Sequence, residues 1–250
     1  MMADKAGWHS QDEFWELFEP ILFDQDRLER ARAEVERIVR LVGATQGERV
    51  LDLCCGPGRH SLELSRLGYE VVGVDRTASF IQKAKAEAAS KQLPIAFLVG
   101  DMREFRQPSA FHLVMNLFGS FGYFEDPAED RRVVENAYAS LIPGGKFLIE
   151  TMGKEIAARD FREKDWSEVD DGFILAERKP LQHWSRMQTR WILLKGDRRI
   201  EHTVTVRSYS AEELASLLLQ CGFQEIRVFG DLQGSDYDQN ASRLVIVGKK

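Results

Sequence analysis

The sequence contains few cysteines, no long apolar run and no excess of basic residues. Three cysteines in 250 residues do not form a disulfide framework, so we expect a reducing compartment, the cytoplasm. No apolar run is long enough to span a bilayer, and residues 1–5 lack a signal-peptide segment, so no membrane partner is expected. The formal net charge of −6 argues against nucleic acid, because phosphate binding requires a basic surface. A chain of this length can bury one sizeable core.

The sequence does contain a strand–turn–helix–strand pattern near residue 50. An apolar run over residues 50–53 leads into a turn with Gly56 and Gly58, and a second apolar run ends at Asp75. Glycine has no Cβ, so such a turn lets the backbone come close to a ligand. An acidic residue at the end of the second strand can accept hydrogen bonds from both ribose hydroxyls. The pattern therefore predicts a site for a nucleoside cofactor.

The turn is a poor match to a dinucleotide site. Ser61 replaces the third glycine of the dinucleotide fingerprint, Pro57 separates the other two, and Asp52 would repel a pyrophosphate. The Asp52 carboxylate suits an ammonium or a sulfonium instead. Together with Asp75 it favours a cofactor that has a cationic amino-acid end and a ribose, as S-adenosylmethionine has. An α/β domain whose glycines serve only the turn is the alternative.

From about residue 50 to the end, the chain resembles the class I S-adenosylmethionine-dependent methyltransferases. The resemblance rests on five segments in the family's order: residues 51–58, Asp75, residues 100–102, residues 111–116 and residues 141–150. Cys54 stands where the family usually has glycine, so the turn is more crowded there. Five motifs in the correct order are a far more specific signal than any single one.

The resemblance implies S-adenosylmethionine as the cofactor and a set of residues around it. Asp101 would accept a hydrogen bond from the exocyclic amine of adenine, and the backbone N–H of Met102 would meet a ring nitrogen. No Cys or His pair at ligand spacing accompanies Cys54 and Cys55, so no metal is expected. The implied cofactor contacts are Asp52, Cys54, Gly56, Gly58, Asp75, Arg76, Asp101, Met102, Asn116 and Leu117.

The alternation of apolar runs and helical patterns predicts an α/β fold. We expect a Rossmann-like, doubly wound, seven-stranded sheet with an antiparallel edge hairpin, and a small antiparallel β insert after the fifth strand. Three strands are expected in the insert, at residues 172–179, 186–194 and 200–207. We divide the chain into an N-terminal helical segment and possible lid (1–45), a cofactor-binding core (46–152), a β insert that roofs the substrate pocket (153–208), and a last helix with closing strands (209–250).

Several helix boundaries are also visible in the sequence. Residues 26–43 place apolar side chains on one helical face, and Gly43 is expected to end that helix. Asp126, followed by proline, is expected to cap a helix that reaches residue 141. Ser210 with Glu213 forms a capping box for the last helix.

A β insert after the fifth strand bears on the substrate, because open α/β sheets bind ligands at the carboxyl ends of their strands. The arrangement resembles methyltransferases that act on small molecules, including amino-sugar N,N-dimethyltransferases. In those enzymes a histidine follows the fourth strand, and Tyr123 takes its place here. We expect Tyr123 to face the transferring methyl and to orient the acceptor, because a phenol with a pKa near 10 is a weak base. A buried aromatic residue with a satisfied hydroxyl is the alternative.

The insert contains the other polar residues that we considered for the site. His183 is a second catalytic candidate, at the mouth of the pocket. His202 shares a strand face with Val204, so we expect it in the core. Arg186 and Arg207 are expected on solvated strand faces.

The sequence thus predicts methyl transfer from S-adenosylmethionine to N or O of a small-molecule substrate. Two alternatives stay open: an RNA or protein methyltransferase on the same core, and a nucleotide-binding or NAD-dependent protein. An enzyme that methylates base amines would carry Asn-Pro-Pro-Tyr/Phe after the fourth strand, whereas residues 116–119 read Asn-Leu-Phe-Gly. The sequence does not indicate an oligomeric state.

Overall fold

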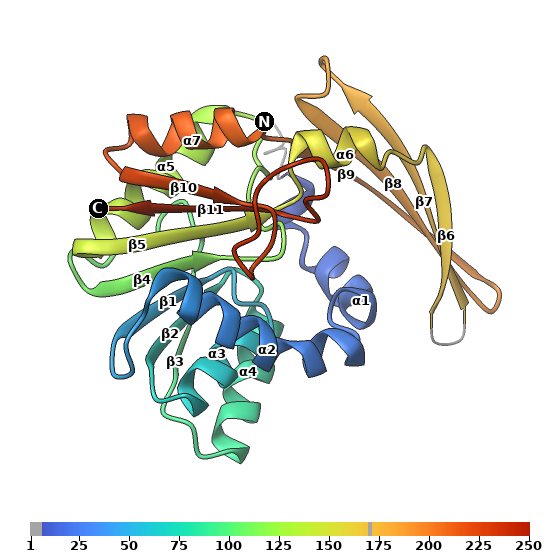
Figure 1. The fold of residues 1–250 in the computed structure, drawn as a ribbon. Coiled ribbons are helices and arrows are strands. Elements are labelled where there is room, and N and C mark those ends of the chain that lie inside the picture. Colours follow the sequence, from blue (N-terminus) through green and yellow to red (C-terminus); the bar gives the residue numbers. More distant parts are fainter. Residues whose placement is uncertain (1–6, 170–171) are drawn as a thin grey trace, which may run out of the picture.

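The structure is a computed structural model that describes residues 7–169 and 172–250, so the expectation for residues 1–5 lies outside it. Seven strands of the described residues form one sheet with the order β10-β11-β5-β4-β1-β2-β3 (Figure 1). Strands β1 to β5 pair in parallel, whereas β11 runs antiparallel to both β5 and β10. The strands are β1 (Arg49–Leu53), β2 (Glu70–Asp75), β3 (Ala96–Val99), β4 (Phe111–Asn116), β5 (Leu141–Thr151), β10 (Gln224–Phe229) and β11 (Leu244–Lys249).

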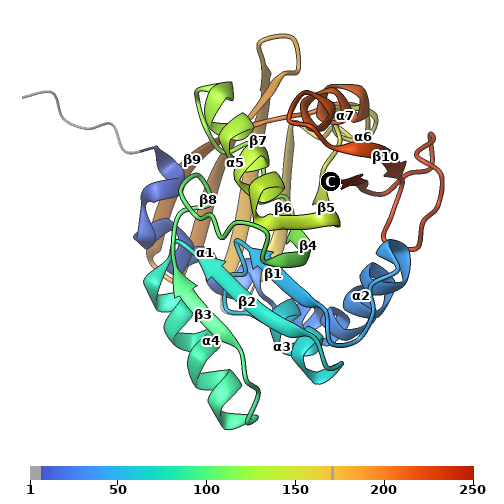
Figure 2. The same ribbon diagram turned by 90° about the vertical axis from the view of Figure 1, so that its left-hand side faces the viewer.

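Helices cover both faces of this sheet (Figures 1 and 2). One face packs against α2 (Gln25–Val42), α3 (Arg59–Arg66) and α4 (Ala78–Ser90), and the other against α5 (Pro127–Ser140) and α7 (Ala211–Gln220). This topology brings the carboxyl ends of the parallel strands to one edge, where open α/β sheets bind ligands. The predicted Rossmann-like fold with an antiparallel edge is confirmed.

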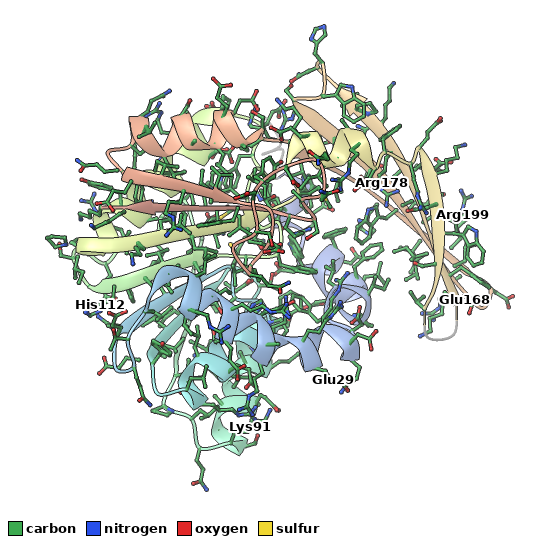
Figure 3. The ribbon with its side chains drawn as sticks, viewed as in Figure 1. Glu29, Lys91, His112, Glu168, Arg178 and Arg199 are labelled. Carbon is green, nitrogen blue, oxygen red and sulfur yellow. The ribbon has the colours of Figure 1, made fainter. Side chains whose placement is uncertain are left out.

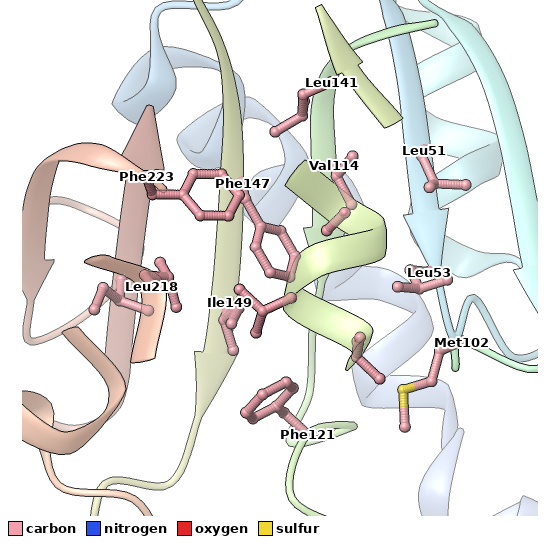
Figure 4. Close-up of a cluster of buried hydrophobic side chains, with 14 of the residues drawn as sticks. Leu51, Leu53, Met102, Val114, Phe121, Leu141, Phe147, Ile149, Leu218 and Phe223 are labelled. Atoms are coloured by element: carbon pink, nitrogen blue, oxygen red, sulfur yellow. The ribbon is translucent and has the colours of Figure 1, made fainter. Parts of the chain in front are cut away.

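The largest core lies between the sheet and helices α5 and α7 (Figure 4). Phe147 and Ile149 of β5 point into it, and the ring of Phe223 lies 5.8 Å from that of Phe147. Leu148 points to the opposite face and packs with residues of α2, as the pleat of a strand requires. Full burial of such side chains contributes roughly 1.5–3 kcal/mol each.

The helix boundaries follow the signals in the sequence. The side chain of Asp24 accepts the N–H of Arg27 at 2.8 Å, and Gly43 adopts a φ of 64° after the last turn of α2. Asp126 caps α5, and Ser210 caps α7 as part of a capping box, as predicted. Within the described residues, no helix combines the length and the apolar character needed to cross a bilayer.

A second, antiparallel sheet follows β5 and has the order β6-β7-β8-β9. The three predicted strands of the insert are confirmed, whereas β6 and the short helix α6 that precedes it were not predicted. Both faces of β6 carry polar residues, so its sequence lacks the alternation by which a strand is recognised. These elements are α6 (Lys154–Arg159), β6 (Lys164–Val169), β7 (Gly172–Leu181), β8 (Arg186–Lys195) and β9 (Arg198–Arg207).

The N-terminal segment lies between the two sheets (Figure 1). Trp8–Ser10 forms a 3₁₀ helix, η1, and Asp12–Leu22 forms α1. Phe14 and Phe18 of α1 are buried against apolar residues of the second sheet, among them Ile174. The opposite face of that sheet carries charged side chains, of which Glu168 and Arg199 are labelled in Figure 3. The N-terminal segment therefore joins the second sheet to the rest of the molecule.

Candidate active site

A cavity lies at the carboxyl ends of β1 and β2, the edge at which open α/β sheets bind ligands. Its walls come from the turn after β1, the loops after β2, β3 and β4, and the N-terminal segment. Six of the ten residues predicted to contact the cofactor line it: Cys54, Gly56, Asp75, Arg76, Asp101 and Met102. The expected edge of the sheet thus carries a cavity that contains most of the expected side chains.

Asp75 ends β2 and holds the turn after β1 in place. Its Oδ2 atom accepts the N–H of Gly56 and its Oδ1 atom that of Thr77, both at 2.8 Å. A carboxylate accepts about four hydrogen bonds, and the Thr77 side chain also donates to Asp75, so capacity remains for at least one further donor. Burial raises the pKa of Asp75 above its ordinary value, and the two N–H groups oppose this effect. The carboxylate can therefore accept a hydroxyl of a ribose while it fixes the turn.

Gly56 is required by both conformation and space. Its φ is +56°, and a Cβ atom there would lie 2.7 Å from the ring of Phe23. The Phe23 ring packs edge to face against Phe80 at 5.4 Å, and both rings line the cavity. The glycine thus lets an aromatic wall of the cavity come close to the backbone of the turn.

Cys54 adopts a left-handed conformation with a φ of 65°. For a residue other than glycine this costs roughly 1–2 kcal/mol, which agrees with the glycine usual at this place in the resembled family. The Sγ atom lies 3.4 Å from Sδ of Met102. Burial, together with the nearby Asp75 carboxylate, raises the pKa of the Cys54 thiol well above its ordinary value. Cys54 is therefore an uncharged wall residue.

Asp101 is an ionised acceptor beside Met102. It accepts the backbone N–H of Arg103 at 2.8 Å and an Nη2–H of the same residue at 2.7 Å. Although burial acts in the opposite direction, these hydrogen bonds hold the pKa of Asp101 below its ordinary value. Arg103 also pairs with Glu129 at 2.6 Å. An exocyclic amine in the cavity would find a charged partner at Asp101.

Arg76 connects the N-terminal segment to the end of β2. Its guanidinium donates to the backbone oxygen of Ser10 and, at 2.8 Å, to Oδ1 of Asp12. The contact places η1 and α1 over the cavity, because Arg76 directly follows Asp75.

Tyr123 lies in the loop after β4 and lines the cavity. Its ring packs against Trp8 at 4.9 Å and Trp15 at 5.8 Å. Burial raises the pKa of Tyr123 above its ordinary value near 10, so the hydroxyl stays protonated at neutral pH. The phenol is therefore a donor and not a base.

A second cavity lies between the N-terminal segment, the start of α5 and the ends of β7 and β8. Two residues, His9 and Tyr123, line both cavities, so the two spaces are neighbours. The charged residues in the wall of the second cavity are Arg103, Glu125, Asp126, Glu129 and Arg186.

Arg186 and Arg207 do not lie on solvated strand faces, contrary to the expectation from the sequence. The side chain of Arg186 donates to the backbone oxygen of Phe124 at 2.9 Å. The backbone N–H of Arg207 donates to the backbone oxygen of Gly122 at 2.6 Å. These contacts hold the loop on both sides of Tyr123. The second sheet therefore positions a residue of the cavity.

Asp52 does not line the cavity, which corrects its expected role as a direct contact. Along β1, Val50 and Asp52 face the layer of α2 and α3, because successive side chains of a strand alternate. Asp52 is 2% exposed and accepts the hydroxyl of Ser61 at 2.6 Å. Ser61, which stands in place of the third glycine of the dinucleotide fingerprint, is thus the hydrogen-bond partner of Asp52.

Gly58, Asn116 and Leu117 also lie outside the cavity wall. Gly58 precedes α3 with a φ of +88°, and a Cβ atom there would lie 2.9 Å from the Phe97 ring. Asn116 is buried with its Nδ2 atom 3.3 Å from the oxygen of Leu53, and its Oδ1 atom has no partner among the described residues. The Leu117 side chain packs in the core under α2.

His183 does not line either cavity, which corrects its expected place at the mouth of the pocket. It is an exposed residue of the turn between β7 and β8, with a φ of 56°. A hairpin turn projects past the last paired residues, so its side chains leave the sheet. His202 packs against Phe14 at 5.6 Å and Phe18 at 5.7 Å, as expected of a core residue.

Sequence reasoning missed several residues of the cavity wall. They are His9, Trp15, Phe23, Thr77, Phe80, Gly100, Ser120 and Phe124. The aromatic residues near the N-terminus were a signal for two of them, Trp15 and Phe23, but their spacing does not tell which side of the segment faces the cavity.

Comparisons with known proteins point to methyltransferases. Residues 50–145 match a family described as "Methyltransferase domain". The chain is 26% identical over 212 residues to the putative methyltransferase YqeM of Bacillus subtilis, covering 81% of this chain and 84% of that protein.

Solved structures share the fold. An S-adenosylmethionine-dependent methyltransferase from Clostridium acetobutylicum has a TM-score of 0.75 at 14% identity, covering 95% of this chain and 98% of that one. The sugar N-methyltransferase KedS8 from Streptoalloteichus has a TM-score of 0.69 at 20% identity, covering 92% of each chain.

Residues 50–145 match a methyltransferase domain, and the fold is that of solved S-adenosylmethionine-dependent methyltransferases. The chain is a methyltransferase, and its cofactor is S-adenosylmethionine. The residues present fit that group: Asp75 and Asp101 offer carboxylate acceptors in the cavity, and aromatic side chains form much of the remaining wall.

Proposed function

We propose that the protein transfers a methyl group from S-adenosylmethionine to N or O of a small molecule. The observation that carries this proposal is the pair of neighbouring cavities with His9 and Tyr123 in the wall between them. One cavity suits the cofactor, and the other offers an acceptor access to the same wall. The likeness in fold to a sugar N-methyltransferase supports a small acceptor.

In this proposal Asp75 binds the ribose, Asp101 and Met102 meet the adenine, and the turn at Cys54 and Gly56 borders the methionyl part. When bound, the cofactor supplies a methyl group on a positively charged sulfur. The protein must then align the acceptor with that carbon and exclude water, and alignment alone can supply up to roughly 7–11 kcal/mol. The N-terminal segment, held by Arg76, would close the site.

Tyr123 is proposed to orient the acceptor atom. Its hydroxyl is a protonated donor, and the loop that carries it is held by Arg186 and Arg207. The second sheet would then act as the roof of the acceptor cavity. The charged groups in that cavity suit a small polar acceptor, and the acidic ones disfavour a polyanion such as RNA.

The proposal is tested with radiolabelled S-adenosylmethionine and a panel of amino sugars, other small amines, phenols and alcohols. We expect label transfer to at least one acceptor by the native protein. The same panel with the Asp75→Ala variant, at a cofactor concentration that does not saturate it, serves as a control, because that variant should bind the cofactor more weakly. Label transfer only to RNA or to protein substrates would overturn the small-molecule assignment.

A further inference from the structure

We infer that His9 is the catalytic base that removes a proton from the acceptor during methyl transfer. The inference rests on the proposed function, because it assigns a role within the same site. His9 lies in η1. Among the described residues, His9 and Tyr123 are the two that line both cavities. A group in this position has access to both an acceptor and the reacting carbon.

The backbone of His9 is fixed at the boundary of the cavities. Its carbonyl oxygen accepts a hydrogen bond from Nε1 of Trp15 at 2.9 Å. The neighbouring Trp8 donates from Nε1 to the backbone oxygen of Thr205 in β9 at 3.0 Å. Arg76 binds the next residue along the chain, Ser10. These bonds anchor η1 to α1, to the second sheet and to the end of β2. The backbone that carries the imidazole of His9 is therefore held in place.

The ring of His9 is held by packing. It lies edge to face against Phe124, with centroids 5.0 Å apart and planes at 85°. In the described part of the chain, neither ring nitrogen of His9 forms a hydrogen bond or an ion pair, in contrast to His60, whose Nε2 lies 2.8 Å from Glu34. Packing therefore holds the imidazole in place, and no hydrogen bond within the described residues occupies its nitrogens.

The charges around the ring favour its neutral form. Arg103 and Arg76 face it as cations, and Asp101 and Glu129 as anions. Each of the two anions is itself paired with Arg103. Burial, and then the Arg103 guanidinium, lower the pKa of His9 below its ordinary value of 6.5. An imidazole that is neutral at pH 7 has one nitrogen free to accept a proton.

The choice between the two shared side chains follows from their protonation states. Tyr123 keeps its proton at neutral pH, so it can donate a hydrogen bond but cannot take up a proton. In the step itself, a bond forms between the methyl carbon and the acceptor N or O while the carbon–sulfur bond breaks. The electron pair of that bond stays on sulfur, which becomes a neutral thioether. The acceptor's proton passes to a ring nitrogen of His9, and the imidazolium later releases it to water.

The test compares His9→Gln with His183→Gln as a matched control, because His183 is exposed and lies outside both cavities. We expect His9→Gln to lower kcat/KM about 100-fold or more and His183→Gln to leave it unchanged. In the native protein and the control, kcat/KM should fall as the pH drops below 6.5, because His9 becomes protonated. This acid limb should be absent from the His9→Gln variant.

A second measurement does not depend on turnover. The imidazole of His9, assigned in a proton NMR titration by its absence from His9→Gln, should titrate with a midpoint below pH 6.5. Its signal should shift when S-adenosylhomocysteine is added, because the ring borders the cofactor cavity. The dissociation constant of S-adenosylhomocysteine should change less than about threefold between the native protein and His9→Gln.

Two results would overturn the assignment of the catalytic base to His9 and leave the proposed function standing. The first is a His9→Gln variant that retains the acid limb and the native kcat. The second is a large loss of S-adenosylhomocysteine affinity with no change in kcat, which would make His9 a cofactor contact. Native protein that transfers methyl to no small acceptor would instead contradict the proposed function, and the role of His9 would fall with it.

Discussion

The Oδ2 atom of Asp75 accepts the backbone N–H of Gly56 at 2.8 Å, which joins the end of β2 to the turn after β1. One carboxylate thereby shapes the turn and offers acceptor capacity to a ligand. The left-handed conformations of Cys54 and Gly56 are part of the same turn. Loss of the Asp75 carboxylate should therefore affect cofactor binding more than loss of any other acceptor in the cavity.

Asp75→Ala should weaken S-adenosylmethionine binding by roughly 1–3 kcal/mol, since charged hydrogen bonds to the ribose would go unmade. Isothermal titration calorimetry measures this change. Asp52→Asn is the matched comparison, because Asp52 faces α3 and keeps an oxygen for Ser61 in the variant. Its cofactor affinity should stay within about threefold of the native value, and an equal loss in both variants would contradict the placement of Asp52 behind the cavity.

Tyr123→Phe should lower kcat about tenfold and leave the dissociation constant of the cofactor nearly unchanged. The expected size corresponds to one hydrogen bond, which contributes roughly 1.5 kcal/mol when it orients the reacting group. Steady-state kinetics and a binding titration together separate the two effects. A variant with native kcat would reduce Tyr123 to a packing role.

Glu34→Gln should destabilise the fold in a pH-dependent way. Glu34 of α2 pairs with Arg59 at 2.5 Å and with His60 at 2.8 Å. Burial opposes ionisation, but these partners lower the pKa of Glu34 from 4.5 to about 2. Because the folded pKa is depressed, the stabilisation is complete above about pH 5 and disappears as the pH falls toward 2.

At pH 7 the Glu34→Gln variant should lose roughly 2–3 kcal/mol of unfolding free energy, and the difference should shrink steadily between pH 5 and pH 2. Urea unfolding at a series of pH values measures it. Glu36→Gln on the same helix is the control, because its pair with Arg32 is exposed and should contribute less than about 0.5 kcal/mol. A pH-independent difference for Glu34→Gln would refute the role of the ion pair.

Gly58→Ala should destabilise the protein more than Gly144→Ala. Both glycines have a left-handed φ, +88° and +80°, so both variants carry the conformational cost of roughly 1–2 kcal/mol. A Cβ atom at position 58 would also lie 2.9 Å from Phe97, whereas nothing lies within 4 Å at position 144. We expect an additional loss of roughly 1–3 kcal/mol for Gly58→Ala in denaturant unfolding. Equal losses of unfolding free energy in the two variants would mean that the core around Phe97 accommodates the added methyl group without an energetic penalty.

The parts of the fold that depend on local chemistry could be predicted from the sequence. Asp126 and Ser210 cap helices where their side chains meet free N–H groups, and Asp75 ends a strand at the binding edge. Strand β6 could not be predicted, because its stability comes from pairing with β7 and not from its own pattern.

The cavity wall was predictable only where a residue belongs to a core motif. Six of the residues predicted to contact the cofactor line the cavity next to strand ends, whereas Asp52 faces the helical layer because of strand alternation. His9 could not be found, because its place depends on contacts of Trp8 with a strand about 200 residues away. His183 was misplaced because the length of a hairpin decides where its turn projects.

The most direct test is a calorimetric comparison of S-adenosylmethionine with NAD on the native protein and the Asp75→Ala variant. We predict that S-adenosylmethionine binds the native protein, that the variant binds it at least fivefold more weakly, and that NAD produces no binding heat with either. Saturable binding of NAD without binding of S-adenosylmethionine would contradict the cofactor site described here.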